Sequence, residues 1–172
     1  MITAEREVMS KNPIDIAREF GGQLPSFGNL AEATDHYERY RQAGLKTLAG
    51  LTADRPGFTM DYSPESLKSL EDVYFSLIET GGFPGLGLSQ QAFESLMGIY
   101  FGAVATRTDP AVHWIVQEFA FAPGKYELGV AKANTTVMVT SLRNLNLMQP
   151  HRKKRDRLYR MFQRFFRNRS GG

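Results

Sequence analysis

Hydrophobic residues recur three and four positions apart in three long stretches of the chain, which is the spacing of one buried side of a helix. The first stretch runs from about Asn29 to Leu51, and the second runs from Ser63 to Ile78. In the third, residues 89–106, apolar residues occupy most positions and few polar residues interrupt them. The pattern predicts three long helices, the third of them largely buried.

Residues typical of helix ends flank these stretches. Asn29 and Ser89 stand where side chains that cap the first turn of a helix are expected. Ser63-Pro64-Glu65 combines a capping serine with a proline at the first helical position and an acid in the first turn. Gly81-Gly82 is typical of the end of a helix. These signals support the helices that the hydrophobic spacing predicts.

The third stretch carries two glycines one helical turn apart, Gly98 and Gly102. A glycine inside a helix costs about 1 kcal/mol relative to alanine, and the usual compensation is the close approach of another backbone or side chain. We therefore expect this glycine face to pack either against the helix that begins at Ser63 or against a sheet.

A change from helical spacing to alternation follows the third helix. Residues 113–121 alternate as in a strand, and Ala122-Pro123-Gly124-Lys125 is suited to a type II turn. A second strand starts at Tyr126, Asn134 marks another turn, and residues 135–140 are rich in β-branched residues. Helices followed by a short meander predict an α+β fold, with about four main helices on a small antiparallel sheet.

The amino-terminal part of the chain is less regular. Asn12-Pro13 and Gly21-Gly22 bound one short amphipathic segment, and turn-forming residues follow it. We predict that residues 1–28 form an arm with a short helix, and that residues 29–168 form a single α+β domain that includes the carboxy-terminal helix.

The carboxy-terminal segment has the pattern of a basic amphipathic helix. Its apolar stripe at helical spacing consists of Leu158, Met161, Phe162, Phe165 and Phe166. Basic residues precede and flank this stripe, and they define a candidate polyanion-binding surface: Arg152, Lys153, Lys154, Arg155, Arg157, Arg160, Arg164 and Arg167.

Three interpretations of this helix remain open. The stripe can dock on the domain and leave the arginines in solvent, which is the ordinary role of an amphipathic helix. The helix can instead lie on an anionic membrane surface with its phenylalanines inserted. In the third interpretation, the arginines contact nucleic-acid phosphates. Burial of the apolar stripe is worth on the order of 10 kcal/mol before entropy, which favours docking.

Charge is distributed unevenly along the 172 residues. Nine of the 21 Lys and Arg residues and one of the 18 acidic residues lie between Arg152 and Arg169. The rest of the chain therefore holds 12 basic and 17 acidic residues, and the net charge of +3 hides an acidic body with a basic end. The chain has no cysteine, no signal-peptide pattern and no long apolar run, so we expect a cytoplasmic protein.

No arrangement of residues demands a particular chemistry. No two of the three histidines share a metal-binding spacing, and no nucleophile elbow or phosphate-binding glycine loop occurs. We assign no catalytic, metal or cofactor residue. Glu71 and Asp72 are expected on an exposed helix edge. His113, Trp114 and Tyr126 are the candidate residues for a small-ligand pocket, although an aromatic cluster on a small sheet is more often core.

One arrangement resembles a recurrent family of bacterial α+β domains. It comprises residues 99–104 (Ile-Tyr-Phe-Gly-Ala-Val), Trp114, a meander, and residues 158–162 (Leu-Tyr-Arg-Met-Phe) in a last helix. Some of these uncharacterised domains are immunity or accessory proteins encoded near toxin genes. The resemblance covers roughly residues 63–166, and Ala103 departs from it where an acid is frequent. It implies a non-catalytic bacterial protein that binds another protein. The alternative is nucleic-acid or anionic-membrane binding through the basic helix.

Overall fold

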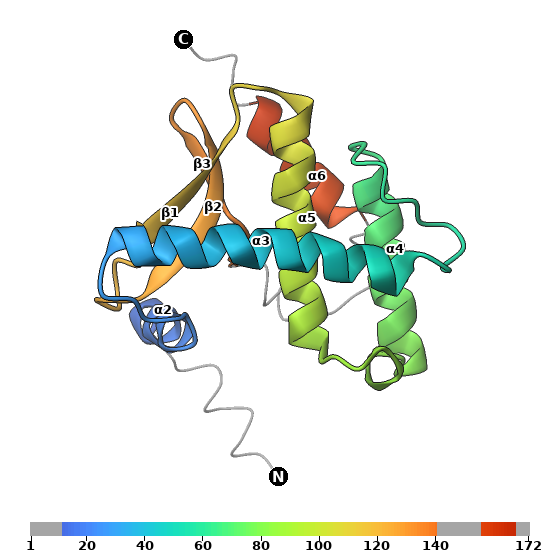
Figure 1. Ribbon diagram of the computed structural model, residues 1–172, viewed down its shortest axis with the longest axis horizontal. Coiled ribbons are helices and arrows are strands. Elements are labelled where there is room, and N and C mark those ends of the chain that lie inside the picture. Colours follow the sequence, from blue (N-terminus) through green and yellow to red (C-terminus); the bar gives the residue numbers. More distant parts are fainter. Residues whose placement is uncertain (1–11, 141–155, 168–172) are drawn as a thin grey trace. The chain divides into compact units, whose positions relative to one another are not determined.

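The computed structural model describes residues 12–140 and 156–167, and the described chain contains five α-helices and three strands (Figure 1). The helices are α2 (Pro13–Gly22), α3 (Leu30–Thr52), α4 (Ser66–Thr80), α5 (Gln90–Thr108) and α6 (Arg157–Arg167). A short 3-10 helix, η1 (Pro84–Leu86), links α4 to α5. The strands β1 (His113–Glu118), β2 (Tyr126–Lys132) and β3 (Thr135–Met138) form one sheet in that order. The predicted α+β fold with a small meander sheet is confirmed.

The two turns of the sheet lie where the sequence predicts them. The backbone N–H of Lys125 donates to the carbonyl of Ala122 over 3.1 Å, and Gly124 has the positive φ of 78° that a type II turn requires. β2 and β3 pair antiparallel, and Lys132 lies opposite Thr135 across the second turn. β1 ends at Glu118, earlier than predicted, because the chain already turns at Phe119, whose carbonyl accepts from the Ala122 N–H.

The predicted caps form. The Asn29 side chain accepts from the N–H of Glu32 over 2.9 Å, and Ser89 accepts from the N–H of Ala92 over 3.1 Å. Gly81 ends α4 with φ of 62°. α4 begins at Ser66, later than the predicted start at Ser63, although the Ser63 hydroxyl still accepts from the Ser66 N–H.

The chain groups into two compact units. Unit 1 comprises Met1–Tyr37 and Val116–Glu127, and unit 2 comprises Glu38–Ile115 and Leu128–Gly172. α3, β1 and β2 each contribute residues to both units. The predicted boundary near residue 29 stays a prediction.

Unit 1 is held by contacts between its amino-terminal segment and the tip of the β1–β2 hairpin. The Tyr37 hydroxyl donates to the Tyr126 carbonyl over 2.7 Å, and the Phe27 ring lies 6.0 Å from the Tyr126 ring. The Lys125 ammonium donates to the Leu24 carbonyl over 2.9 Å. α2 approaches the hairpin so closely that a Cβ on Gly21 would lie 2.7 Å from Phe119. The described part of the predicted arm, residues 12–28, therefore packs on the hairpin tip.

Unit 2 has a core built around α5. Phe93, Tyr100 and Phe101 of this helix are fully buried, and Phe93 stacks on Tyr74 of α4 at 6.2 Å between ring centroids. This agrees with the prediction that the third apolar stretch is largely buried. The glycine face of α5 packs on the sheet side, the second of the two predicted alternatives, because Gly102 lies against Trp114 of β1.

Candidate functional site on α6

The apolar side of α6 is docked on unit 2. Leu158, Phe162 and Phe165 are buried, and the Phe162 ring meets the Phe101 ring edge to face at 6.3 Å. α6 packs against α4, α5 and β3. The structure thus agrees with the docking interpretation. Insertion of these side chains into a membrane would require α6 to leave its place.

The opposite side of α6 is a stripe of arginines. Arg160, Arg164 and Arg167 are exposed and Arg157 is half-buried. At helical spacing the four positions fall within roughly 80° of one another, and the apolar positions lie across the helix from them. α6 carries no acid in its first turn and two arginines in its last turn, where the helix dipole favours cations. The remaining predicted cations, Arg152, Lys153, Lys154 and Arg155, lie outside the described residues.

A buried carboxyl group lies under the start of α6. Glu71 of α4 is only 1 % exposed, so the prediction that it stands on an exposed edge is wrong, whereas its neighbour Asp72 is exposed. Burial raises the pKa of Glu71 to about 7, and the N–H of Arg157 and the charge of Arg160 act in the opposite direction. Its burial is hard to predict from the sequence, because Glu71 follows Leu70 directly and lies one position outside the apolar stripe.

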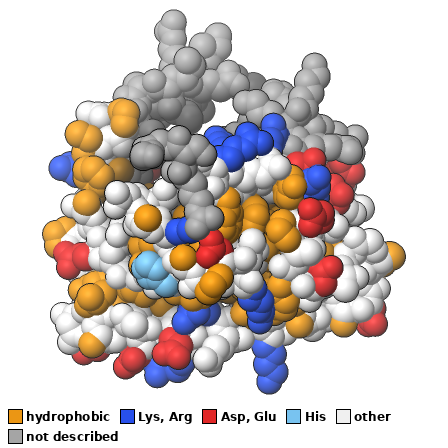
Figure 2. Space-filling view, turned by 90° about the horizontal axis from the view of Figure 1, so that it is seen from above, with side chains coloured by type: hydrophobic (Ala, Val, Ile, Leu, Met, Phe, Trp, Pro, Cys, Tyr) orange, Lys and Arg blue, Asp and Glu red, His pale blue; other side chains and the backbone are white. Residues whose placement is uncertain are grey.

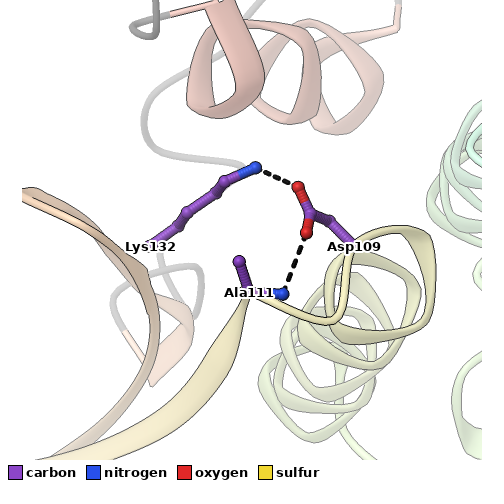
Figure 3. A network of polar contacts seen from close by, with 3 residues as sticks. All are labelled: Asp109, Ala111 and Lys132. Carbon is purple, nitrogen blue, oxygen red and sulfur yellow. Dashed lines mark hydrogen bonds and ion pairs between the residues drawn. The ribbon is translucent and has the colours of Figure 1, made fainter.

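Two aromatic rings on α6 form cation–π contacts with lysines of other elements. The Lys68 ammonium of α4 lies 4.2 Å from the centroid of Tyr159, and the Lys132 ammonium of β2 lies 5.3 Å from that of Phe166. Lys132 also forms an ion pair with Asp109, whose second carboxylate oxygen accepts from the N–H of Ala111 (Figure 3). Both partners of this pair are largely buried, so Lys132 is already neutralised and is not part of the arginine stripe.

A second polar cluster lies inside unit 2, between α4 and α5. The Tyr74 hydroxyl donates to Glu94 over 2.5 Å, and the Gln90 amide donates to the same carboxylate over 3.2 Å. Burial raises the pKa of Glu94 and of Tyr74. Tyr74 and Glu94 are both closed off from solvent, so the arrangement suits a structural network better than catalysis. Sequence reasoning missed this cluster, although a helix buried on most sides must satisfy its few polar residues internally.

The residues of the candidate pocket have separate surroundings. His113 is exposed, and the half-buried Trp114 lies between Gly102 and the guanidinium of Arg41, which is 4.6 Å from the indole centroid. Tyr126 is buried in unit 1 beside Phe27. A ligand pocket at His113, Trp114 and Tyr126 stays a prediction.

Exposed apolar side chains reach the surface in one unit. In residues 12–140 and 156–167, the large hydrophobic side chains that are well exposed are Ile14 at 46 %, Leu30 at 52 % and Phe121 at 50 %, and all three belong to unit 1. On the face drawn in Figure 2, hydrophobic side chains lie among lysines, arginines and acids.

Two features are absent from residues 12–140 and 156–167. There, no three His, Asp or Glu side chains lie close enough together to hold a metal ion. None of the helices described combines the length and the apolar character needed to cross a bilayer.

The fold and the surface therefore define an α+β protein with a docked, arginine-faced terminal helix. A family model described as "Uncharacterised protein YwmA" matches residues 26–166. "Uncharacterized protein YwmA" of Bacillus subtilis (strain 168) is 30 % identical over 113 residues, which span 65 % of this chain and 71 % of that relative. The chain belongs to the YwmA family. No solved structure matches it.

Proposed function

We propose that this protein is a non-catalytic binding protein whose target is another protein, and that unit 1 provides the contact. The observation that carries the proposal is that the large hydrophobic side chains well exposed among the described residues, Ile14, Leu30 and Phe121, all belong to that unit. Exposed apolar side chains mark an interaction surface where they form one patch.

The aromatic residues around Phe121 suit a binding surface. Phe121 meets Phe119 edge to face at 5.9 Å, and Phe119 meets Phe20 of α2 at 5.5 Å. Phe20 and Phe119 are half-buried, which holds the exposed Phe121 on a packed base. Aromatic anchors on a firm support contribute most of the affinity in many protein interfaces. We name Phe20, Phe119 and Phe121 the unit 1 patch.

An inhibitor of a partner protein, as immunity proteins are, is one form of this function. The resemblance to bacterial immunity-type domains supports it, and the absence of cysteine from the sequence suits the cytoplasm as its compartment. The proposal assigns no reaction and no cofactor.

The test is a photo-crosslinking experiment in the cells that make the protein. A photoreactive phenylalanine analogue is placed at Phe121 and, as a matched control, at the exposed Lys46 of α3 in unit 2. We expect one protein to be crosslinked from position 121 and not from position 46. An excess of unmodified protein should suppress the product, and the same excess of the F121D variant should not.

Two results contradict the proposal. One is an identical set of crosslinked proteins from both positions, or equal competition by F121D. The other is a product that contains only two copies of this chain, because the unit 1 patch would then serve self-association instead of partner binding.

A further inference from the structure

The exposed arginines of α6 form a rigid row. Arg160, Arg164 and Arg167 lie at i, i+4 and i+7, which places them along about 10 Å of one helix face. The helix beneath them is fixed, because Leu158, Phe162 and Phe165 on its other side are buried. A fixed row of charges loses less conformational entropy on binding than the same charges on a free segment.

Two of the three arginines, Arg164 and Arg167, are not neutralised from within the described residues. No ion pair joins Arg164 or Arg167 to an acid in residues 12–140 or 156–167. Asp156 precedes α6, and Glu71 of α4 lies under its start. Near its other end, Asp109 is paired with Lys132, whose ammonium lies over the Phe166 ring. The charge of Arg160 lowers the pKa of Glu71, so Arg160 already interacts with one acid of the domain.

The chemistry of the arginine row limits the classes of partner that it can bind. Guanidinium groups stay charged and bind phosphate with two parallel hydrogen bonds, whereas a lysine ammonium acts as a point charge. Membrane binding by a helix of this kind needs apolar side chains for insertion, and here they face the core. Each strand of a nucleic-acid duplex carries one phosphate per about 3.4 Å of helix axis, and such a regular line of charges suits a linear row of arginines.

We propose that Arg160, Arg164 and Arg167 form a nucleic-acid-binding site that contacts backbone phosphates of a duplex. The site is separate from the unit 1 patch and does not depend on it. Because phosphates carry no sequence information, binding is independent of base sequence and falls steeply with salt. Since the chain outside residues 152–169 has a net charge of −5, attraction of a polyanion is confined to the basic end.

The test measures binding of the full chain to fluorescein-labelled DNA duplexes of two unrelated sequences, by fluorescence polarisation over a series of salt concentrations. The wild type should bind both duplexes alike. Removal of three phosphate contacts in R160Q/R164Q/R167Q should flatten the slope of log K against log salt by roughly 3 and weaken binding at low salt at least about tenfold. R160K/R164K/R167K should restore most of the slope, because it restores the charge.

A matched control removes three exposed cations elsewhere. R18Q/R39Q/K46Q changes the net charge by the same amount on α2 and α3 and should bind within about twofold of the wild type. Thermal melting of each variant checks that α6 remains docked. Three results overturn the proposal: no saturable binding by the wild type at low salt, equal losses in the two glutamine triples, or binding to anionic phospholipid vesicles without binding to either duplex.

Discussion

The indole of Trp114 packs so closely on Gly102 that a Cβ at that position would stand 2.1 Å from the indole Cη2 atom. The contact joins α5 to β1 at a place where the helix has no side chain. It explains why a helix of the core carries a residue that disfavours helices. The half-buried indole also contacts the guanidinium of Arg41, which lies 4.6 Å from its centroid, and a shift of the ring would disturb this contact.

Substitution of Gly102 by alanine should therefore destabilise the protein. Overpacking of this kind costs about 1 to 3 kcal/mol, which exceeds the gain of up to about 1 kcal/mol that alanine brings to a helix. Gly50 of α3 has nothing within 4 Å of its Cβ position, so G50A should be neutral or stabilising. Urea denaturation of both variants compares the two effects, and a stabilising G102A would contradict the packing described here.

The buried carboxyl of Glu71 should make stability depend on pH. Its pKa is raised from 4.5 to about 7 in the folded protein, so folding favours the protonated form. The contribution is fully present below pH 4.5 and is lost as pH rises to about 7, by at most about 3 kcal/mol. Burial raises the pKa of Glu94 and Glu127 as well, so the test is a difference between variants.

E71Q should remove the part of the pH-dependent stability loss that comes from ionisation of Glu71, and it should stabilise the protein above pH 7. D72N changes the adjacent, exposed carboxyl and should leave the pH profile as it is. Free energies of unfolding at several pH values provide the comparison. Parallel profiles for E71Q and the wild type would show that Glu71 is accessible to solvent.

Substitution of only one partner of the Lys132–Asp109 ion pair should destabilise the protein most. Either K132M or D109N leaves one buried group without its partner, which costs on the order of 3 kcal/mol. The double variant should lose less than the sum of the two single losses, because no unpaired charge remains. A double-mutant cycle by denaturation measures this coupling, and additive losses would mean that the two groups do not interact.

If α6 is docked, substitutions on its two sides should differ in their effect on stability. F162A removes a buried ring and should cost about 3 kcal/mol or more, with faster amide exchange along α6. R164A, two residues further on, changes an exposed side chain and should stay within about 0.5 kcal/mol of the wild type. Equal exchange rates in α6 for F162A and the wild type would mean that Phe162 does not hold the helix.

The hydrophobic spacing predicted most of the architecture because it reports directly on which side of each element is buried. Capping and turn-forming residues added the caps at Asn29 and Ser89 and the turn at residues 122–125, while the partner of the glycine face of α5 was left open between two alternatives. The hydrophobic spacing failed for Glu71, because a position beside an apolar stripe is buried or exposed according to what packs there. In this case the covering element is α6, more than eighty residues away in the sequence.

Prediction from the sequence also succeeded for one candidate surface and failed for the other. The arginine positions could be read from helical spacing alone, since α6 is short and strongly two-sided. The exposed position of Phe121 could not, because the sequence pattern extended β1 to residue 121 and the strand ends at Glu118. Where a strand stops depends on the turn that follows, and the alternation of residues does not reveal it.

The docking of α6 also bears on the order in which unit 2 assembles. α4 and α5 are joined by a short connection, whereas α6 meets α4 only after a loop of about 80 to 90 residues has closed. Loop closure on that scale costs about 2 kcal/mol more than closure of a ten-residue connection. We expect α6 to join after α4 and α5 have met, and to be the first of the three to detach. A brief detachment would set the arginine row free of its support while the rest of unit 2 stays folded.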